Sequence, residues 1–260
     1  MPLVSEKIDL AVDWLAKYRE NSKTKGFVVG VSGGVDSAVT STLCCMTGAN
    51  VVTLSMPIKQ DKAQLKRATA HMNWLTGKFS NACHDTIDLT AAYDNFIDCL
   101  PEVNDLAKVN SRSRLRMVTL YAMANSLEYL VAGTGNKVED YGIGFFTKYG
   151  DGGVDLSPIG NLLKSEVYEM ARYLGIHSSI LAAPPSDGLW NDGRTDEQQI
   201  GASYEELEWA LNYYDLNGFK FESLDERQKE VLKIYTKLHK GNSHKMLMPP
   251  VCTLSNKEKK

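Results

Sequence analysis

The sequence predicts an α/β protein built on a doubly wound parallel sheet. Short apolar segments alternate with amphipathic helical segments from residue 5 to residue 133, a pattern typical of β-α-β units with right-handed crossovers. Residues 27–31 are almost continuously apolar and end in Ser32-Gly33-Gly34, as expected of a buried strand that leads into a tight turn. Ligands of such folds bind at the carboxyl ends of the strands, so this turn is the first candidate site.

Hydrophobic periodicity and punctuation residues place the other elements. The predicted strands are residues 27–31, 51–56, 84–89 and 128–133. The predicted helices are residues 5–21, 36–47, 61–76, 90–100, 106–127, 164–174, 203–214 and 224–240. Gly48 is expected at a C′ position, and capping boxes are expected at Ser203 with Glu206 and at Ser223 with Glu226. The polar, glycine-rich segment 142–160 is predicted to be a functional loop.

Composition is that of an ordinary globular protein. Of the 260 residues, 43% are hydrophobic and 23% are charged, and the net charge is -3, so the global positive excess of a nucleic-acid carrier is missing. The apolar stretches are too short to span a bilayer. We therefore expect neither a nucleic-acid nor a membrane partner. We expect a single domain over residues 1–255 and a solvated tail at 256–260.

The cysteines point to a reducing compartment. None forms a Cys-x-x-Cys pair, and an odd number argues against a disulfide framework. The five are Cys44, Cys45, Cys83, Cys99 and Cys252. We expect reduced and mostly buried thiols, and the charged N-terminus does not read as a signal peptide. The predicted location is cytoplasmic.

The turn after the first strand has the chemistry of a pyrophosphate site. It lacks both the lysine of a Walker A loop and the Gly-x-Gly-x-x-Gly of dinucleotide folds. The hydroxyls of Ser32 and Ser37 and the N–H groups at a helix N-terminus suit phosphate oxygens, and Asp36 suits the Mg²⁺ that neutralises them. The turn resembles the PP-loop of the ATP pyrophosphatase family, whose members cleave ATP between its α and β phosphates. A turn that only tightens strand–helix packing is the alternative.

Motifs in the second half narrow this resemblance to the NAD synthetase family. They are Gly133-Thr134-Gly135-Asn136-Lys137-Val138-Glu139 and, from Gly144 to Asp155, the sequence GFFTKYGDGGVD. The match continues through residues 110–117, Pro158-Ile159-Gly160, Lys164, Pro185-Ser186, Asp196-Glu197 and His244-Lys245. In that family ATP adenylates the nicotinate carboxylate of deamido-NAD, pyrophosphate leaves, and ammonia then displaces AMP to give NAD.

The resemblance implies site residues, position by position. Asp36 and Glu139 are the implied Mg²⁺ ligands, and they are joined by Lys164 and Asp151 as catalytic residues. The implied ATP-binding residues are Gly30, Val31, Ser32, Gly33, Gly34, Val35, Asp36, Ser37, Thr134, Lys164 and Ser186. The implied deamido-NAD-binding residues are Arg114, Lys148, Asp155, His244 and Lys245.

Two groups of neighbouring residues have open roles. Arg112, Arg114 and Arg116 are spaced two apart and do not share one helical face. Arg114 and Arg116 fit the arginines of the family, and Arg112 is predicted to be a surface charge. The aromatic residues of segment 145–149 form either a stacking wall for the pyridine ring or a local core.

The resemblance also implies partners and movements. Family members are homodimers in which the neighbouring subunit completes the substrate site. Only 25 residues precede Gly26, which leaves no room for the glutaminase domain of longer relatives, so ammonia is the expected nitrogen source. Segment 184–202 is expected to order over the substrate and exclude water. The rival interpretations are another AMP-forming PP-loop enzyme, amidating or thiolating, and a non-catalytic nucleotide sensor.

Overall fold

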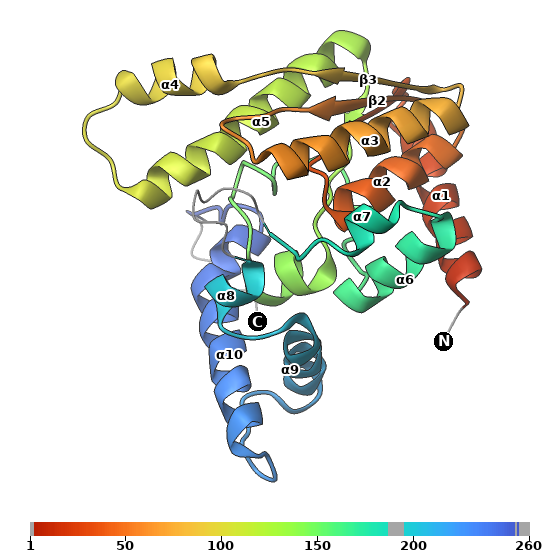
Figure 1. Cartoon of the computed structure of the whole chain (residues 1–260). Coiled ribbons are helices and arrows are strands. Elements are labelled where there is room, and N and C mark those ends of the chain that lie inside the picture. Colours follow the sequence, from red (N-terminus) through yellow and green to blue (C-terminus); the bar gives the residue numbers. More distant parts are fainter. Residues whose placement is uncertain (1–2, 187–194, 253, 255–260) are drawn as a thin grey trace.

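A parallel four-stranded sheet lies between helices in the upper part of the molecule as drawn in Figure 1. The computed structural model describes residues 3–186, 195–252 and 254. The strands are β1 (Gly26–Gly30), β2 (Asn50–Ser55), β3 (Ala82–Thr86) and β4 (Leu130–Val131), in the order β3-β2-β1-β4. From β1 the chain moves outward to β3 and then returns to place β4 on the other side of β1. The predicted doubly wound α/β fold is confirmed, and its switch point lies between β1 and β4.

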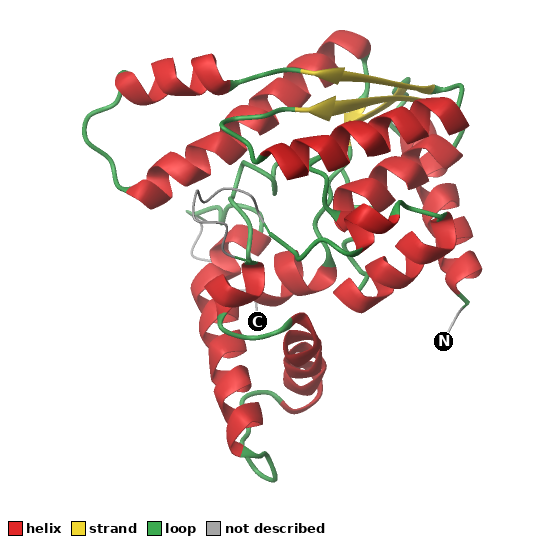
Figure 2. Cartoon of the chain, in the orientation of Figure 1, coloured by secondary structure: helices red, strands yellow, loops and turns green. Residues whose placement is uncertain are grey.

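Helices account for most of the remaining chain (Figure 2). Those in the first two thirds are α1 (Val4–Asn21), α2 (Val35–Met46), α3 (Lys62–Lys78), α4 (Thr90–Asp98), α5 (Asp105–Leu127), a π-helix η1 (Lys137–Ile143) and α6 (Lys164–Leu174). They are followed by α7 (Ser178–Leu181), α8 (Asp196–Ile200), α9 (Tyr204–Asn217) and α10 (Glu226–Met246). In the described part of the chain, no helix is both long and apolar enough to cross a bilayer.

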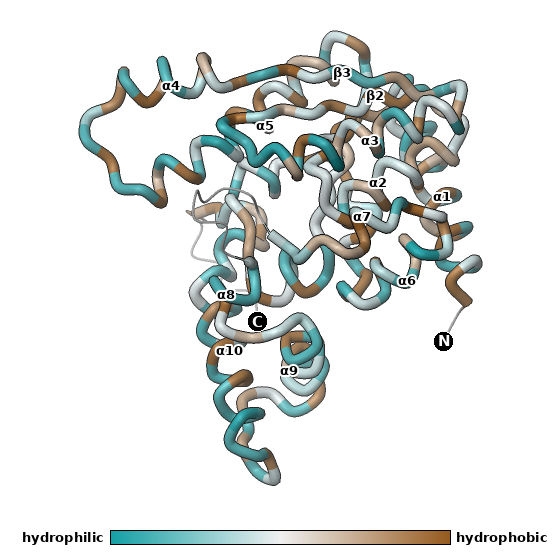
Figure 3. Tube along the Cα trace, in the orientation of Figure 1, coloured by the Kyte–Doolittle hydropathy of each residue, from teal (hydrophilic) through white to brown (hydrophobic). Residues whose placement is uncertain are grey.

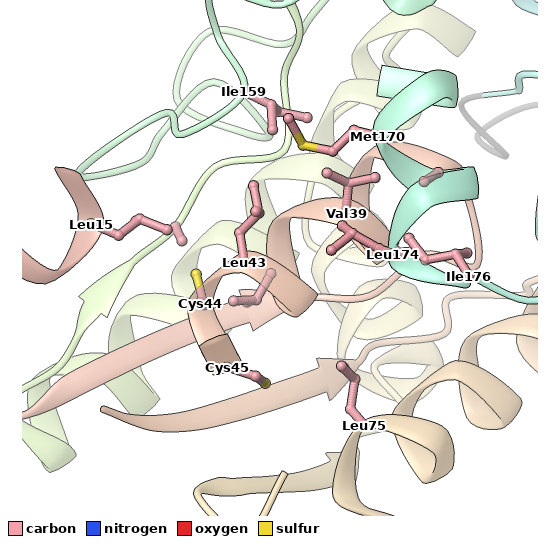
Figure 4. Packing of buried hydrophobic residues seen from close by; sticks show 14 of the residues in the cluster. Leu15, Val39, Leu43, Cys44, Cys45, Leu75, Ile159, Met170, Leu174 and Ile176 are labelled. Atoms are coloured by element: carbon pink, nitrogen blue, oxygen red, sulfur yellow. The ribbon is translucent and has the colours of Figure 1, made fainter. Parts of the chain in front are cut away.

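Alternating side chains of β1 supply two separate cores, one on each face of the sheet. Phe27 and Val29 belong to a cluster that includes Leu43 of α2 and Met170 of α6 and that Figure 4 shows from close by. Val28 belongs to a second cluster with residues of β2, α4 and α5. Because β1 is buried on both faces, the turn that follows it starts from a rigid strand.

The C-terminal helices have a core of their own. Side chains of η1, α9 and α10 form a third cluster, centred on Leu207, Leu211 and Tyr235. Hydrophobic and hydrophilic residues alternate along α10 in Figure 3, as expected of a helix with one buried face. This cluster matters for the site because it fixes η1, which follows β4.

Several predicted boundaries were wrong: the fourth strand is residues 130–131 rather than 128–133, and the last helix ends at 246 rather than 240. Three further differences have a clear physical reason. The third strand is residues 82–86 rather than 84–89, because β2 pairs with it from Val51 with Ala82 to Ser55 with Thr86. The third helix was predicted to end at residue 76 but continues through Gly77 to Lys78. A side chain at Gly77 would meet open space, so the position does not require glycine, and the only cost of glycine there is its low helix propensity. The expected capping box at Ser223 is absent, because Ser223 has a φ of 66° and an N-cap needs extended backbone.

The cap of α10 is instead Asp225, which accepts a hydrogen bond from the N–H of Gln228 at 2.8 Å. The capping box at Ser203 and the C′ position of Gly48, with a φ of 77°, are both confirmed. Segment 184–202, which was expected to order over the substrate, includes part of the loop after α7 and all of α8, but its residues 187–194 lie outside the described residues. The predicted tail at 256–260 also lies outside them.

Two predictions of burial were also wrong. Arg112 is buried, and its guanidinium lies 5.3 Å from the ring centre of Tyr93 in α4, which covers this side of α5. The cysteines are free, as expected, but only Cys44 and Cys45 are buried. Cys83, on the exposed edge strand β3, and also Cys99 and Cys252 are exposed. Periodicity within a segment does not show which neighbouring element covers it.

One buried histidine connects α2 and α3. A ring nitrogen of His71 lies 3.0 Å from the Ser41 hydroxyl, the ring stacks on Trp74, and the side chain is 1% exposed. Burial lowers the pKa of His71 from 6.5 to about 4. Protonation in the folded state would place an imidazolium charge in the core between the two helices.

The free energy of unfolding should therefore decrease as the pH is lowered through a defined window. Between pH 6.5 and pH 4 the unfolded chain binds a proton at His71 that the folded chain does not, so acidification destabilises the fold, by up to about 3 kcal/mol. We expect His71→Gln to flatten the pH dependence of the free energy of unfolding in this window, measured by urea denaturation. His84→Gln, on the exposed strand β3, should leave it unchanged; an unaltered slope in His71→Gln would contradict the assignment.

Candidate active site

The turn after β1 is held in shape by its own two serines. The N–H of Ser32 donates to Ser37 Oγ at 3.2 Å, and the Ser37 hydroxyl donates to the carbonyl of Gly34 at 3.0 Å. The N–H of Gly34 in turn donates to Ser32 Oγ at 3.2 Å. The hydroxyls thus close the turn, while the first turn of α2, with N-cap Gly34, directs its N–H groups at the space beyond.

Gly33 is required at its position. Its φ is 88°, and a Cβ atom there would lie 2.5 Å from the backbone oxygen of Gln64 in α3. A side chain would therefore have to displace the α3 backbone. The contact shows that α3 packs directly against the turn.

A pocket of about 270 Å³ opens between the carboxyl ends of β1 and β4. Every residue predicted to bind ATP lines it, from Gly30 to Ser37 and including Thr134, Lys164 and Ser186. So do Glu139 and Asp151. The fold thus brings the predicted ATP, metal and catalytic residues to one cavity.

At the base of the pocket one lysine joins two carboxylates. The ammonium of Lys164, at the start of α6, lies 2.6 Å from Asp36 Oδ2 and 2.9 Å from Glu139 Oε1. The Lys164 side chain is 4% exposed, and the carboxylate side chains are 18% and 15% exposed. Burial opposes the charge on Lys164, but the two carboxylates outweigh it and raise the pKa of the ammonium.

The two carboxylates respond differently to this environment. Burial raises the pKa of Asp36, and the attraction of Lys164 offsets this only in part. Burial also acts on Glu139, but Lys164 and a hydrogen bond from Tyr204 overcome it and lower the pKa of Glu139. Lys164 and Glu139 are therefore charged at neutral pH, and the lysine holds the first turns of α2 and η1 together.

Two residues that the sequence interpretation did not assign to the site orient these carboxylates. The Asn136 amide donates to Asp36 Oδ1 at 3.2 Å, and its oxygen accepts the N–H groups of Val138 and Glu139, both at 3.1 Å. Asn136 is thereby the N-cap of η1. Its position three residues before Glu139 was a readable capping signal.

The other is Tyr204, at the start of α9. Its hydroxyl donates to Glu139 and lies 3.2 Å from Asp196 Oδ2 in α8. No local pattern pairs Tyr204 with Glu139, because the two are 65 residues apart and meet only through the C-terminal core.

Two more acids line the pocket. Asp151 accepts hydrogen bonds from the Ser113 hydroxyl at 2.6 Å and from the N–H of Thr147 at 3.0 Å. Asp140, not predicted, lies next to Gly135, and burial together with Asp151 raises its pKa well above the usual value. The pocket wall is therefore richer in acids than the motifs suggested.

Most residues predicted to bind deamido-NAD form a second group, outside the pocket lining. Arg114 donates to the carbonyl of Lys148 at 3.4 Å, and the Lys148 ammonium donates to the carbonyl of His244 at 2.5 Å. Lys245 donates to two carbonyls of segment 144–146, at 2.7 and 2.8 Å, and burial lowers its pKa. The structure brings these four residues together around one loop.

Asp155 lies apart from both groups. It accepts hydrogen bonds from the Tyr121 hydroxyl at 3.0 Å and from the N–H of Val131 at 2.8 Å. It borders a shallow depression with Trp14 and Tyr18 of α1. These bonds attach the end of the glycine-rich loop to β4.

An anion-binding turn at the switch point of a parallel sheet, facing paired carboxylates, defines a nucleotide-binding α/β protein of the PP-loop class. The family model described as NAD synthase matches residues 7–249. The chain belongs to the NAD synthase family.

Individual relatives agree with this. An NH(3)-dependent NAD(+) synthetase of Carboxydothermus hydrogenoformans is 38% identical over 252 residues, which cover 95% of this chain and 96% of the relative. The structure of an NMN synthetase from Francisella tularensis has a TM-score of 0.86 at 32% identity and covers 98% of this chain and 100% of that one. An NH3-dependent NAD synthetase from Campylobacter jejuni has a TM-score of 0.79 at 29% identity, with coverage of 97% and 100%.

The contact of Gly33 with α3 can be tested with a matched pair of variants. Gly33 and Gly48 both have positive φ, at 88° and 77°, but only a Cβ at Gly33 would meet backbone, whereas nothing lies within 4 Å at Gly48. Gly33→Ala should therefore destabilise the fold by about 1–3 kcal/mol more than Gly48→Ala. Equal losses in urea denaturation would show that the turn does not depend on this contact.

Proposed function

We propose that the chain is an ammonia-dependent NAD synthetase, a ligase that forms a carbon–nitrogen bond at the expense of ATP. The observation that carries the proposal is the pocket in which the Ser32–Ser37 turn, with its Asp36, faces Lys164 and Glu139. An anion-binding turn next to paired carboxylates suits a reaction that joins two anionic substrates. Membership of the NAD synthase family supports the same activity.

The proposed reaction has two steps. A carboxylate oxygen of the nicotinate attacks the α-phosphorus of ATP, the bond to the α,β-bridging oxygen breaks, and pyrophosphate leaves with that electron pair. Ammonia then attacks the activated carbonyl carbon, AMP leaves, and the nitrogen loses a proton to give the amide. Activation is needed because a free carboxylate is a poor acyl donor.

Each group of the pocket has a role in this proposal. The first turn of α2 presents N–H groups to the phosphates. Lys164 places a fixed positive charge between the two rim loops, where charge builds on the α-phosphate during attack. Asp151, held by Ser113 and Thr147, lines the same cavity as the reacting groups.

Magnesium is proposed as the cofactor, with Asp36 and Glu139 as its ligands. The donor set fits: one cation, the Lys164 ammonium, already contacts both carboxylates, so one ion can be shared between them. Within the described residues no group of three or more His, Cys, Asp or Glu forms a metal cage. Mg²⁺ characteristically takes one or two carboxylates and completes its shell with water and substrate phosphates, whose charge it neutralises.

The group of Arg114, Lys148, His244 and Lys245 is the proposed contact for the dinucleotide substrate, together with Asp155. The three cations contact the loop at 144–149 or the backbone of His244, next to the ATP pocket, which suits the pyrophosphate of a dinucleotide. Their donors now contact backbone carbonyls, so substrate phosphates would replace those partners.

A homodimer is proposed from an exposed apolar face. Leu10, Trp14 and Tyr18 follow one another at a spacing of four on α1 and are 64%, 43% and 38% exposed. Tyr141, 49% exposed, borders the same depression as Trp14 and Tyr18. An aromatic patch of this kind is typical of subunit interfaces.

The location proposed for the chain is the cytoplasm. All five cysteines are free, and Cys44 and Cys45 are neighbours in the core. Free thiols of this kind persist in reducing compartments, which also contain ATP.

The activity is tested by supplying ATP, Mg²⁺, ammonium and deamido-NAD and following NAD and pyrophosphate together. We expect equimolar formation of both, and a loss of roughly 100-fold or more in Asp36→Asn because the variant loses a charged ligand for Mg²⁺ and the ion pair with Lys164. Asp9→Asn on the exposed side of α1 should retain full turnover. Folded protein that forms no NAD, or an Asp36→Asn variant with normal turnover, would refute the assignment.

A second candidate substrate is nicotinate mononucleotide. The NMN synthetase from Francisella tularensis has the higher TM-score of the two structures above. The same adenylation and amidation of nicotinate carboxylate would then give NMN. Comparing kcat/KM for the mononucleotide and for deamido-NAD decides between them, and the larger value identifies the substrate.

The dimer is tested by sedimentation at several concentrations. Trp14→Asp should weaken self-association, because it places a charge in the centre of the apolar face. Leu216→Asp, at a site that is 84% exposed at the end of α9, should leave it unchanged. A wild-type chain that sediments as a monomer throughout would contradict the proposal.

A further inference from the structure

The wall of the ATP pocket contains more acids than bases. The acidic lining residues are Asp36, Glu139, Asp140, Asp151 and Asp196, and the basic ones are Arg67, Arg116 and Lys164. ATP and the pyrophosphate it releases are both highly anionic. The few basic side chains of this wall therefore decide how the departing pyrophosphate is held.

Two of these three cationic side chains already donate hydrogen bonds to protein acceptors. Lys164 is held between Asp36 and Glu139. Arg116 donates from Nε to the carbonyl of Met56 at 2.9 Å and from Nη2 to Gln60 at 2.8 Å. Both side chains keep the pocket in shape, which leaves few of their donors for a ligand.

Arg67 is different. Its Nε donates to the carbonyl of Gly33, inside the anion-binding turn, at 3.2 Å. Within residues 3–186, 195–252 and 254, its two terminal amino groups have no hydrogen-bond acceptor. The bond at Nε fixes the guanidinium plane beside the turn and leaves the two-pronged end available.

The packing of α3 keeps Arg67 there. A Cβ built on Gly33 would lie 3.3 Å from Arg67 Cβ and 3.1 Å from the Ala68 nitrogen, so the helix is in close contact with the turn at Arg67 itself. The side chain is half-buried and lines the pocket. Arg67 therefore has little freedom to leave the turn.

We propose that Arg67 binds the β and γ phosphates of ATP and stabilises the pyrophosphate that leaves on adenylation. This inference rests on the proposed NAD synthetase activity. When the carboxylate oxygen bonds to the α-phosphorus, the electron pair of the broken bond passes to the bridging oxygen and adds negative charge to the pyrophosphate. A guanidinium beside the turn meets that charge with two parallel N–H groups, a geometry that suits phosphate better than an ammonium does.

The test measures binding of inorganic pyrophosphate, with Mg²⁺, and of AMP separately by calorimetry. We expect Arg67→Ala to weaken pyrophosphate binding roughly ten- to hundredfold, the range for a lost charge-assisted hydrogen bond, with AMP binding unchanged. Arg67→Lys should recover part of the loss, since it restores charge without the two-pronged geometry. Lys66→Ala, an exposed neighbour on α3 that does not line the pocket, is the matched control.

The outcomes are distinct. Pyrophosphate binding of wild-type strength in Arg67→Ala, with NAD formation intact, overturns the role of Arg67 and leaves the proposed function standing. Equal weakening of AMP and pyrophosphate also overturns it, because it shows that Arg67 only supports the turn. A wild-type chain that binds neither ligand and forms no NAD overturns the proposed function, and this inference with it.

Discussion

The site depends on one buried ion triad, the Lys164 ammonium between Asp36 and Glu139. Each carboxylate comes from the first turn of the helix that follows a different strand, Asp36 from α2 after β1 and Glu139 from η1 after β4, and without the cation between them two largely buried negative charges would repel each other. Desolvating three charges is costly and is compensated only if the geometry and the surrounding hydrogen bonds are good. Here Asn136 and Tyr204 supply those bonds, one from each side.

The fold supplies the triad through the order of its strands. Because β4 lies next to β1 while β2 and β3 lie on the other side, the loops after β1 and β4 diverge and leave a crevice between them. The N-terminus of helix α2 points into the crevice, and α3 packs against the turn at Gly33. The first residue of α6, Lys164, extends its side chain into the same crevice. The C-terminal helices add Tyr204 through a separate core, so the pocket is assembled from both halves of the chain.

The electrostatic balance of the pocket explains how it handles anions. Acids predominate in its wall, and its most buried cation is already paired. In the proposed reaction ATP is therefore held by backbone N–H groups, by the Mg²⁺ proposed at the two carboxylates, and by the arginine proposed to bind phosphate beside the turn.

The sequence by itself determined the alternation of elements, the turn from Ser32 to Ser37, and the membership of Asp36, Glu139 and Lys164 in one site. The first two follow from local periodicity and from a motif whose spacing is fixed along the chain, and the third follows from the resemblance to the NAD synthetase family. Tertiary structure alone decided that Lys164 lies between the two carboxylates, that Tyr204 and Arg67 reach the site, and that Arg112 is buried under α4. Such contacts join elements dozens of residues apart, and their partners are set by how helices pack on the sheet, which no local pattern records.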